Sequence, residues 1–486
     1  MEAFKEVFFG GAPKGVKSKK IAPKIYTTNL IDSSENIIRR NLFEILAWRL
    51  PGCVISHKSA QLLRPTEQGY IYITYSFTKK ITDYPGIVLN IMQGPTHIAS
   101  DIRLGSSDVY CSSEYRWILE VLQPARKNKD GESKGLPISA IEERLDSMIR
   151  IGGEERLNLF RDRAREIATE LNLTQEFEKL NKLISALLAT HSSNILTTTQ
   201  GKARAGGEPM DPARISIFEA LYEELSNRYF PVYEDNNKSE EAFRMFSFFE
   251  SYFSNYIEGT EFEISEAKQI VDTGITIPKR IADSHDILGT FKLLSNRQEM
   301  SLIPKTEDEF IKLLQHRHSV LLEGRPECSP GFFKDVRNRA GNTEFVAPEL
   351  VIGTLKYAFK LYCNLKEPFA KAAYMMFICS EIHPFIDGNG RVSRIMMNAE
   401  LFSQGQIRII IPTVFREDYI LSLRSLSRHK NPQPFINVLQ KMQNFSANLW
   451  GEDFYALDAY LRECNAYSKP DEAKLLYINR IGTFKG

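Results

Sequence analysis

The chain has 486 residues, of which 43% are hydrophobic and 25% are charged, a composition typical of folded proteins rather than disordered ones. Its 62 Lys and Arg residues balance 61 Asp and Glu residues, so the overall charge provides no attraction to nucleic acid or to a membrane. The length is sufficient for two or three domains with sizeable cores.

The six cysteines are scattered, with no Cys-x-x-Cys pair and no Cys/His spacing of a zinc site. We interpret them as reduced thiols of a cytoplasmic protein. The N-terminal sequence has an acidic residue near its start and only a short apolar patch, so we expect no secretory signal peptide. No apolar run approaches the roughly 18 residues that a membrane-spanning helix needs. We therefore expect a cytoplasmic protein that does not bind membranes.

The first part of the chain is expected to contain both strands and helices. Residues 1–20 are rich in Gly, Lys and Pro, which predicts a flexible basic arm. Residues 21–196 are expected to form an α+β module. Alternating β-branched and aromatic residues over 70–92 predict a small sheet. Apolar residues at helical spacing over 157–171 and 177–187 predict two amphipathic helices packed on that sheet.

The rest of the chain is expected to be helical. Gly, Thr and Pro cluster over 197–212 without an apolar period, which predicts a linker. Beyond it we expect a helical segment over 213–270, a helical domain over 271–440 and a C-terminal helical extension over 441–486. Residues 331–346 carry Gly, Asn and Thr between helices and predict an exposed β-hairpin. The expected fold class is mostly α, with an all-helical core that carries a β-hairpin and follows an α+β module.

The most informative stretch runs from His383 to Arg394 and reads HPFIDGNGRVSR. It connects a helix over 369–382 that is apolar on all sides to a second helix that starts near Gly390. Gly388 and Gly390 allow positive φ and a close approach of the backbone to a ligand. Several N–H groups can therefore converge on an anion at the start of the second helix.

The side chains of this stretch have complementary chemistry. Arg391 and Arg394 share one face of the first helical turn, where they oppose the helix dipole, so their placement indicates anion binding. Asp387 is an oxygen ligand suited to Mg²⁺ together with substrate phosphates. His383 is the nearby residue suited to deprotonating a hydroxyl near neutral pH. Each feature alone is usually structural, but together they predict a site that holds a polyphosphate and activates a hydroxyl.

The stretch resembles the signature of the Fic family, His-x-Phe-x-(Asp/Glu)-Gly-Asn-Gly-Arg-x-x-Arg, at every fixed position. Proteins of this family use ATP and Mg²⁺ to transfer AMP to a hydroxyl side chain of a target protein. The resemblance implies that His383 is the base, that Asp387 binds the metal and that Phe385 anchors the loop. Gly390 favours nucleotidyl transfer, because the kinase-like branch has lysine there. The remaining positions are implied to bind nucleotide phosphates: Gly388, Asn389, Gly390 and Arg391 the α- and β-phosphates, and Arg394 the γ-phosphate.

An upstream stretch from Ser254 to Gly259, SNYIEG, ends an amphipathic helix. A Glu at the end of a helix faces an unfavourable dipole and needs a cation. The stretch resembles the inhibitory motif of Fic proteins, Ser/Thr-x-x-x-Glu-Gly/Asn, placed N-terminal to the catalytic core. The resemblance implies that Glu258 pairs with Arg394 and blocks the γ-phosphate site. The alternative is an ordinary helix end with an exposed Glu and a capping Gly259.

Similarity to Fic proteins covers roughly residues 243–438 and implies further roles. The 331–346 hairpin would be a flap that holds a strand of the target protein, which carries a Tyr, Ser or Thr hydroxyl. Tyr419 is expected near the nucleoside, with core packing as the alternative. Residues 20–126 resemble the part of abortive-infection-type antitoxins and related regulators that follows their winged helix. The first 20 residues leave little room for the DNA-reading helix of those proteins.

We therefore expect an auto-inhibited protein adenylyltransferase that uses ATP and Mg²⁺. Removal of AMP from modified targets, with Glu258 positioning a water, stays open as an alternative. A DNA-binding regulator whose core only senses nucleotide is a second alternative, and modification of the chain itself and a homodimer also stay open. Four histidines have no partners at metal-ligand spacing and are expected to be surface or core residues: His285, His316, His318 and His429.

Overall fold

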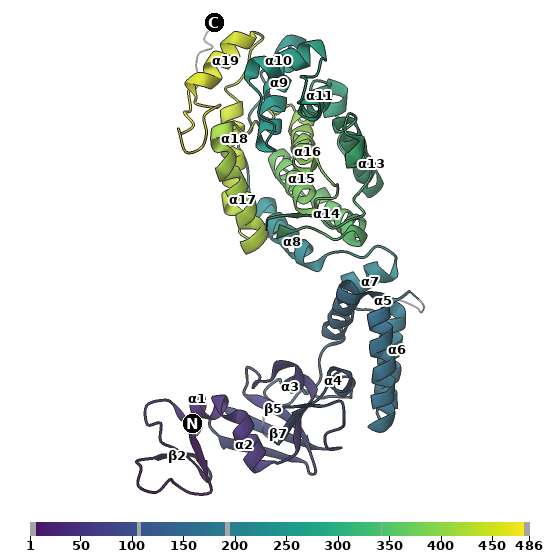
Figure 1. Ribbon diagram of the computed structural model, residues 1–486, viewed down its shortest axis with the longest axis vertical. Coiled ribbons are helices and arrows are strands. Elements are labelled where there is room, and N and C mark those ends of the chain that lie inside the picture. Colours follow the sequence, from purple (N-terminus) through teal and green to yellow (C-terminus); the bar gives the residue numbers. More distant parts are fainter. Residues whose placement is uncertain (1–5, 105–107, 190–194, 342, 481–486) are drawn as a thin grey trace. The chain divides into compact units, whose positions relative to one another are not determined.

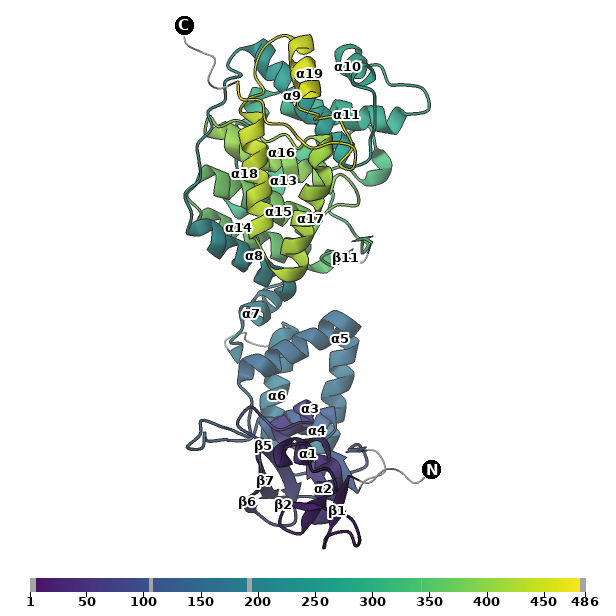
Figure 2. The ribbon, with the colours of Figure 1, turned by 90° about the vertical axis from the view of Figure 1, so that its left-hand side faces the viewer.

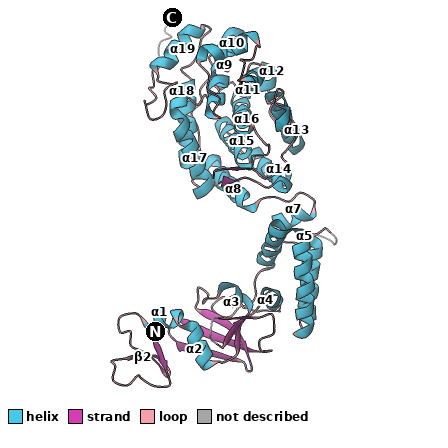
Figure 3. Ribbon diagram, viewed as in Figure 1, coloured by secondary structure: helices cyan, strands magenta, loops and turns pink. Residues whose placement is uncertain are grey.

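The computed structural model describes residues 6–104, 108–189, 195–341 and 343–480. The chain forms two compact units, Met1–Gly207 and Glu208–Gly486, which the colours of Figure 1 separate into purple to blue and teal to yellow. Figure 3 shows that strands gather in the first unit and that helices dominate the second. Within the described residues, no helix is both long and apolar enough to span a bilayer.

A six-stranded mixed sheet forms the centre of the first unit, in the strand order β6-β7-β5-β4-β9-β8. β5 pairs parallel with β7 and β4 pairs parallel with β9, whereas the other neighbours are antiparallel. The sheet predicted over residues 70–92 is confirmed as three of these strands. The strands are β4 (Cys53–Ile55), β5 (Tyr70–Tyr75), β6 (Lys79–Tyr84), β7 (Ile87–Gln93), β8 (Ile102–Arg103) and β9 (Val109–Cys111).

The flexible arm expected over residues 1–20 is wrong for its described part. β1 (Val7–Phe9) and β2 (Lys19–Ala22) both pair antiparallel with β3 (Ile25–Thr27). The physical reason is the apolar start of this segment, since Val7 is fully buried and Phe9 stacks on Trp48 with ring centroids 5.0 Å apart. Residues 1–5 lie outside the described residues.

Helices pack around the sheet of the first unit. α1 and α2 bury Ile38, Ile45 and Leu46 against Ile71 and Ile73 of the sheet. The two predicted amphipathic helices exist as α5 and α6, but they form a separate core with α4 rather than packing on the sheet. Gly153, with φ 70°, kinks α5. The helices are α1 (Ser34–Arg40), α2 (Leu42–Arg49), α3 (His57–Leu62), α4 (Glu114–Val121), α5 (Ile138–Glu170) and α6 (Thr174–Leu187).

The linker expected over residues 197–212 contains a helix, α7 (Thr199–Ala205), which corrects the expectation. The Thr198 side chain caps it by accepting from the Gly201 N–H at 3.0 Å, and Arg204 forms an ion pair with Asp146 of α5. These contacts stabilise a helix in a Gly-rich sequence. The boundary between the two units, after Gly207, still falls inside the expected range.

The second unit is a helical bundle around α15 and α16, which lie between α13 on one side and α17 and α18 on the other (Figure 1). α15 is buried almost all round, as its apolar sequence predicts. Its helices are α8 (Pro212–Ser226), α9 (Glu240–Ile257), α10 (Ile264–Thr273), α11 (Ile281–Leu294), α12 (Arg297–Met300), α13 (Glu307–Leu321), α14 (Val351–Cys363), α15 (Pro368–Ile382), α16 (Asn389–Ser403), α17 (Arg416–His429), α18 (Gln433–Ser446) and α19 (Phe454–Glu463).

Two further features of this unit bear on the site. The predicted hairpin is present, with β10 (Arg339–Ala340) antiparallel to β11 (Thr343–Glu344), and Figure 2 shows it at the edge of the bundle below α17. The expected boundary at residue 440 is wrong, because α18 continues through it. The C-terminal extension packs on α9, since Tyr467 stacks on Phe253 of that helix with centroids 5.3 Å apart.

Candidate active site

The loop between α15 and α16 is locked by its own side chains. His383, which has φ 54°, follows directly after α15, and Gly388 with φ 75° precedes α16. The Asn389 side chain accepts from the Phe385 N–H and donates to the Phe385 carbonyl, both at 2.9 Å. Phe385 itself is fully buried, as its implied anchoring role requires. The loop therefore presents its backbone in a fixed conformation at the N-terminus of α16.

His318, on α13, contacts this loop through a hydrogen bond and a ring stack. The Gly331 N–H donates to its Nδ1 at 2.9 Å, so Nε2 carries the proton and donates to the Asp387 carbonyl at 3.0 Å. Its ring stacks on Phe385 with centroids 3.7 Å apart. Burial lowers the pKa of His318 to about 4, which agrees with a neutral ring. The sequence predicts a surface or core histidine here, but not this link between the loop and the hairpin.

The tautomer of His383 follows from its contacts. Nδ1 lies 3.2 Å from the Ser380 carbonyl, which can only accept, so Nδ1 carries the proton and Nε2 keeps a free lone pair. One face of the ring stacks on Phe345, with centroids 3.8 Å apart and planes 8° from parallel. Burial lowers the pKa of His383 to about 4. The half-buried ring is therefore a neutral proton acceptor.

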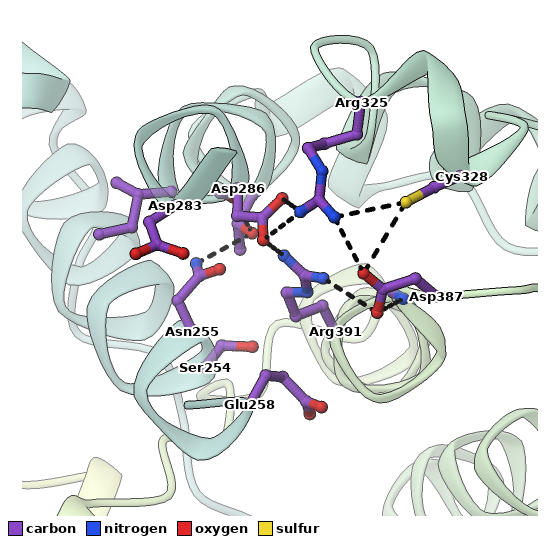
Figure 4. A network of polar contacts seen from close by, with 12 residues as sticks. Ser254, Asn255, Glu258, Asp283, Asp286, Arg325, Cys328, Asp387 and Arg391 are labelled. Atoms are coloured by element: carbon purple, nitrogen blue, oxygen red, sulfur yellow. Dashed lines mark hydrogen bonds and ion pairs between the residues drawn. The ribbon is translucent and has the colours of Figure 1, made fainter. Parts of the chain in front are cut away.

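Arg391 lies in a network of charged side chains drawn in Figure 4. Its Nη1 is 2.5 Å from Asp286 Oδ2 on α11, and its Nη2 is 3.5 Å from Asp387 Oδ1. Arg325 Nη1 contacts both oxygens of Asp286 at 3.2 Å, and its Nη2 lies 3.6 Å from Asp387 Oδ2. Arg391 is buried, and its ion pairs with Asp286 and Asp387 connect α11 to the loop that precedes α16.

Arg394 connects the loop to the upstream stretch from Ser254 to Gly259. Its Nη2 donates to Glu258 Oε1 at 2.8 Å and to the Ser254 carbonyl at 2.8 Å, and its Nε donates to Ser254 Oγ at 3.0 Å. Glu258 follows directly after α9, and the Arg394 side chain is only 6% exposed. The contact between Glu258 and Arg394 that the sequence predicts is therefore present.

Glu258 also lies against the N-terminus of α16. A Cβ atom built on Gly390 would overlap Glu258 Oε1, so any larger residue at this position would displace the carboxylate. Glycine at this position thus permits the close approach of Glu258 to the first turn of α16. The N–H groups of this first turn have no partners within the helix and can bind an anion. The carboxylate of Glu258 lies at this position.

The predicted site residues do converge. The loop from His383 to Gly388, both arginines and Glu258 lie around one helix N-terminus, and Tyr419 is buried next to Arg394. The sequence did not identify Asp286, Arg325, His318 or Phe345 as part of the site. Their spacing carries no motif, and only the packing of α11, α13 and the hairpin onto the loop brings them there.

Part of the chain is similar to known proteins. Residues 310–401 match the Fic/DOC family. Protein adenylyltransferase Fic of Nematostella vectensis is 28% identical over 224 residues, covering 44% of this chain and 49% of that protein. Its counterpart in Drosophila persimilis is 25% identical over 237 residues, covering 48% of this chain and 45% of that protein. The chain thus spans about half the length of these relatives. The solved structure of Fic-1 from Caenorhabditis elegans has a TM-score of 0.37 and 18% identity, covering 67% of this chain and 98% of that one.

Proposed function

We propose that this chain, whose residues 310–401 belong to the Fic/DOC family, is an auto-inhibited protein adenylyltransferase. The hydroxyl oxygen of a target Tyr, Ser or Thr attacks the α-phosphorus of ATP. The bond from that phosphorus to the oxygen bridging to the β-phosphate breaks, and pyrophosphate leaves. AMP stays on the target through a new phosphorus–oxygen bond.

The observation that carries this proposal is the state of His383. Its Nδ1–H donates to the Ser380 carbonyl, which leaves the Nε2 lone pair free to take the proton of the target hydroxyl. The low pKa keeps the ring neutral before the reaction. A base in this state next to a helix N-terminus supports attack on a bound phosphate.

The start of α16 supports binding of the triphosphate. Left-handed Gly388 and side-chain-free Gly390 expose backbone N–H groups, including that of Asn389, to an anion. In the proposal this backbone and Arg391 hold the α- and β-phosphates. Arg394, which donates with two nitrogens of its fork, holds the γ-phosphate.

Asp387 fits a magnesium site. Its side chain is 45% exposed, and Mg²⁺ usually takes one or two carboxylates together with phosphate oxygens and waters. In the described part of the chain, no group of three or more His, Cys, Asp or Glu side chains could hold a metal alone, so we propose that the metal binds with the nucleotide. When bound, it neutralises phosphate charge.

The hairpin of residues 331–346 supports docking of a protein target. Its two short strands pair in register, Arg339 with Glu344 and Ala340 with Thr343, and are largely exposed. A target segment could extend this pairing by β-augmentation. Phe345, directly after β11, stacks on His383, so the docked segment would lie close to the base.

Glu258 supplies the auto-inhibition in this proposal. Its carboxylate pairs with the guanidinium assigned to the γ-phosphate and lies against Gly390. A triphosphate bound in the reactive position would have to displace this carboxylate, because two negative groups cannot share the same donors. Activation therefore requires that Glu258 leave Arg394.

One observation favours a second activity, removal of AMP from a modified target. Of the two carboxylate oxygens of Glu258, Oε1 accepts a hydrogen bond from Arg394, and Oε2 has no hydrogen-bond partner among the described residues. Oε2, on a side chain that is 34% exposed, is available to hold a water molecule. Incubating adenylylated target with the wild-type chain and measuring released AMP tests this activity.

The test of adenylyl transfer uses ATP labelled at one phosphate. The Glu258→Gly protein is incubated with cell lysate and ATP labelled either at the α- or at the γ-phosphorus. The proposal predicts that protein becomes labelled with ATP that carries the label at the α-phosphorus and not with ATP that carries it at the γ-phosphorus. Mass spectrometry of the labelled band then identifies the target. Label from the γ-position only would indicate phosphorylation and contradict the proposal.

A further inference from the structure

We propose that Lys334 and Phe345, both on the 331–346 hairpin, are positioning residues of His383, so that the element assigned to target docking also sets the orientation of the base. The inference rests on the proposed adenylyl transfer and deepens it. It concerns residues outside the HPFIDGNGRVSR stretch and ties them to its first residue.

Phe345 fixes one face of the imidazole. The two rings are 3.8 Å apart and within 8° of parallel, while the edge of the imidazole donates from Nδ1 to the Ser380 carbonyl. Tilting the ring out of this plane would break the stack, and flipping it within the plane would break the hydrogen bond. The stack and the hydrogen bond together therefore direct Nε2 to the remaining edge, where a hydroxyl would have to bind.

Lys334 holds the backbone that follows His383. Its N–H donates to the Pro384 carbonyl at 2.9 Å, and its Nζ donates to Asn338 Oδ1 at 2.6 Å. Asn338 in turn donates from Nδ2 to the Phe385 carbonyl at 2.9 Å. The hairpin is thus bonded to the two residues after the base, through one backbone and one side-chain contact.

The charge of Lys334 acts on the same ring. Its side chain is buried, and among the described residues no carboxylate forms an ion pair with it. Burial, followed by nearby Arg214, lowers the pKa of Lys334 to about 8. A buried cation without a counterion is costly, which indicates a role beyond folding. Its field opposes a second positive charge on His383, whereas Glu258 and Asp387 favour one.

The hairpin can transmit target binding to the base. Thr343 and Glu344 form β11 and directly precede Phe345. Arg214 of α8 donates to the Glu344 carbonyl and pairs with Glu381 of α15, which ties the end of β11 to the helix that ends at His383. A segment paired with β11 would therefore restrict Phe345 and, through the stack, the imidazole.

The kinetic test compares matched variants in the Glu258→Gly background. Phe345→Leu removes the stack at similar volume, Phe345→Tyr keeps it, and Tyr455→Leu makes the same kind of change at an exposed position on α19. We expect Phe345→Leu to lower kcat about tenfold with the KM for ATP within about twofold, because a misaligned base costs turnover rather than nucleotide binding. Phe345→Tyr should retain more of the parent kcat than Phe345→Leu does, and Tyr455→Leu should keep the parent kcat.

A second readout does not depend on activity. The ¹⁵N shifts of labelled histidine, with His383 assigned from the His383→Ala protein, report which ring nitrogen carries the proton. We expect Phe345→Leu to mix the two tautomers at neutral pH. We expect Lys334→Met to raise the titration midpoint of His383, and Lys360→Met, at an exposed lysine on α14, to leave it unchanged.

Each residue has its own deciding result. An unchanged kcat and an unchanged tautomer in Phe345→Leu would overturn the role of Phe345. An unmoved midpoint in Lys334→Met would overturn the role of Lys334. If the Glu258→Gly parent itself transfers no AMP, the proposed function fails, and the ¹⁵N shifts alone decide whether the hairpin positions the ring.

Discussion

Arg394 Nη2 lies 2.8 Å from Glu258 Oε1, although 136 residues separate the two positions in the sequence. Arg394 is the last residue of the HPFIDGNGRVSR stretch, and Glu258 follows the last residue of α9. One guanidinium therefore joins the first turns of α16 to the end of α9. The strength of inhibition should depend on every contact that keeps this pair together.

Ser254 provides two of those contacts, and its hydroxyl can be removed alone. Ser254→Ala deletes the acceptor for Arg394 Nε but leaves the carbonyl contact and Glu258 in place. A hydrogen bond to a charged group contributes about 1.5–3 kcal/mol, and each 1.4 kcal/mol is about tenfold, so we expect target labelling to rise by about tenfold or more. The measurement is the initial labelling rate at fixed ATP, with Ser265→Ala, at an exposed serine of α10, as the control. No increase over wild type would show that Ser254 does not support the inhibited state.

Arg416, at the start of α17, holds the end of α9 from another side. Its Nε donates to the Ile257 carbonyl at 3.0 Å, next to Glu258. Because the last carbonyls of a helix have no partners within the helix, Arg416→Ala should loosen this end of α9 and raise labelling about threefold. Arg424→Ala removes an exposed arginine of the same helix and should have no effect. Equal rates in the two variants would contradict the role of Arg416.

The Asp286 carboxylate supports the active-site loop through Arg391. Both side chains are buried, so Asp286→Asn leaves the Arg391 charge with only the distant contact to Asp387. Removing one partner of a buried ion pair costs about 3–5 kcal/mol. We expect a lower urea midpoint for unfolding of the second unit, measured by circular dichroism. Asp283→Asn, on the same helix with an exposed ion pair to Arg280, should change the midpoint little; matching midpoints in the two variants would argue against the account.

The pH dependence of labelling follows from the state of His383. Burial lowers the pKa of its ring to about 4. The ring is therefore neutral above that pH and loses its free lone pair only as the pH falls through about 4. We expect level activity of Glu258→Gly between about pH 8 and about pH 6, where an ordinary histidine with a pKa near 6.5 would already be half protonated. Initial rates measured alongside circular dichroism check this, and a loss centred near pH 6.5 contradicts it.

The sequence predicted the loop and its contact with Glu258 because local chemistry indicates both. Gly388 and the apolar run of α15 determine where the loop begins and ends, and a Glu at the end of α9 needs a cation. Asp286 and His318 could not be predicted in this way. They reach the loop from α11 and α13 only through packing, and a buried aspartate or histidine in a helical sequence is usually structural.

The errors in the first unit have a similar cause. Glycines and lysines in residues 1–20 indicated a flexible arm, but Val7 and Phe9 gain burial by pairing with β3. Gly201 lies within a Gly-rich stretch, yet the Thr198 cap and the Arg204 ion pair with Asp146 form a helix there. In both cases specific contacts, among them the pairing with β3 and the ion pair with Asp146, outweigh the preference of a Gly-rich sequence for an irregular backbone.

Control of adenylyl transfer by Glu258 is tested by measuring AMP transfer from α-labelled ATP by four proteins: wild type, Glu258→Gly, Glu261→Gly and the double variant Glu258→Gly/His383→Ala. Glu261→Gly makes the same change at an exposed position three residues further on. The account predicts that Glu258→Gly exceeds wild type by about tenfold or more, since it frees Arg394 of a charged partner, and that Glu261→Gly does not. It also predicts that the double variant transfers nothing measurable. Equal transfer by wild type and Glu258→Gly, or transfer retained in the double variant, would contradict it.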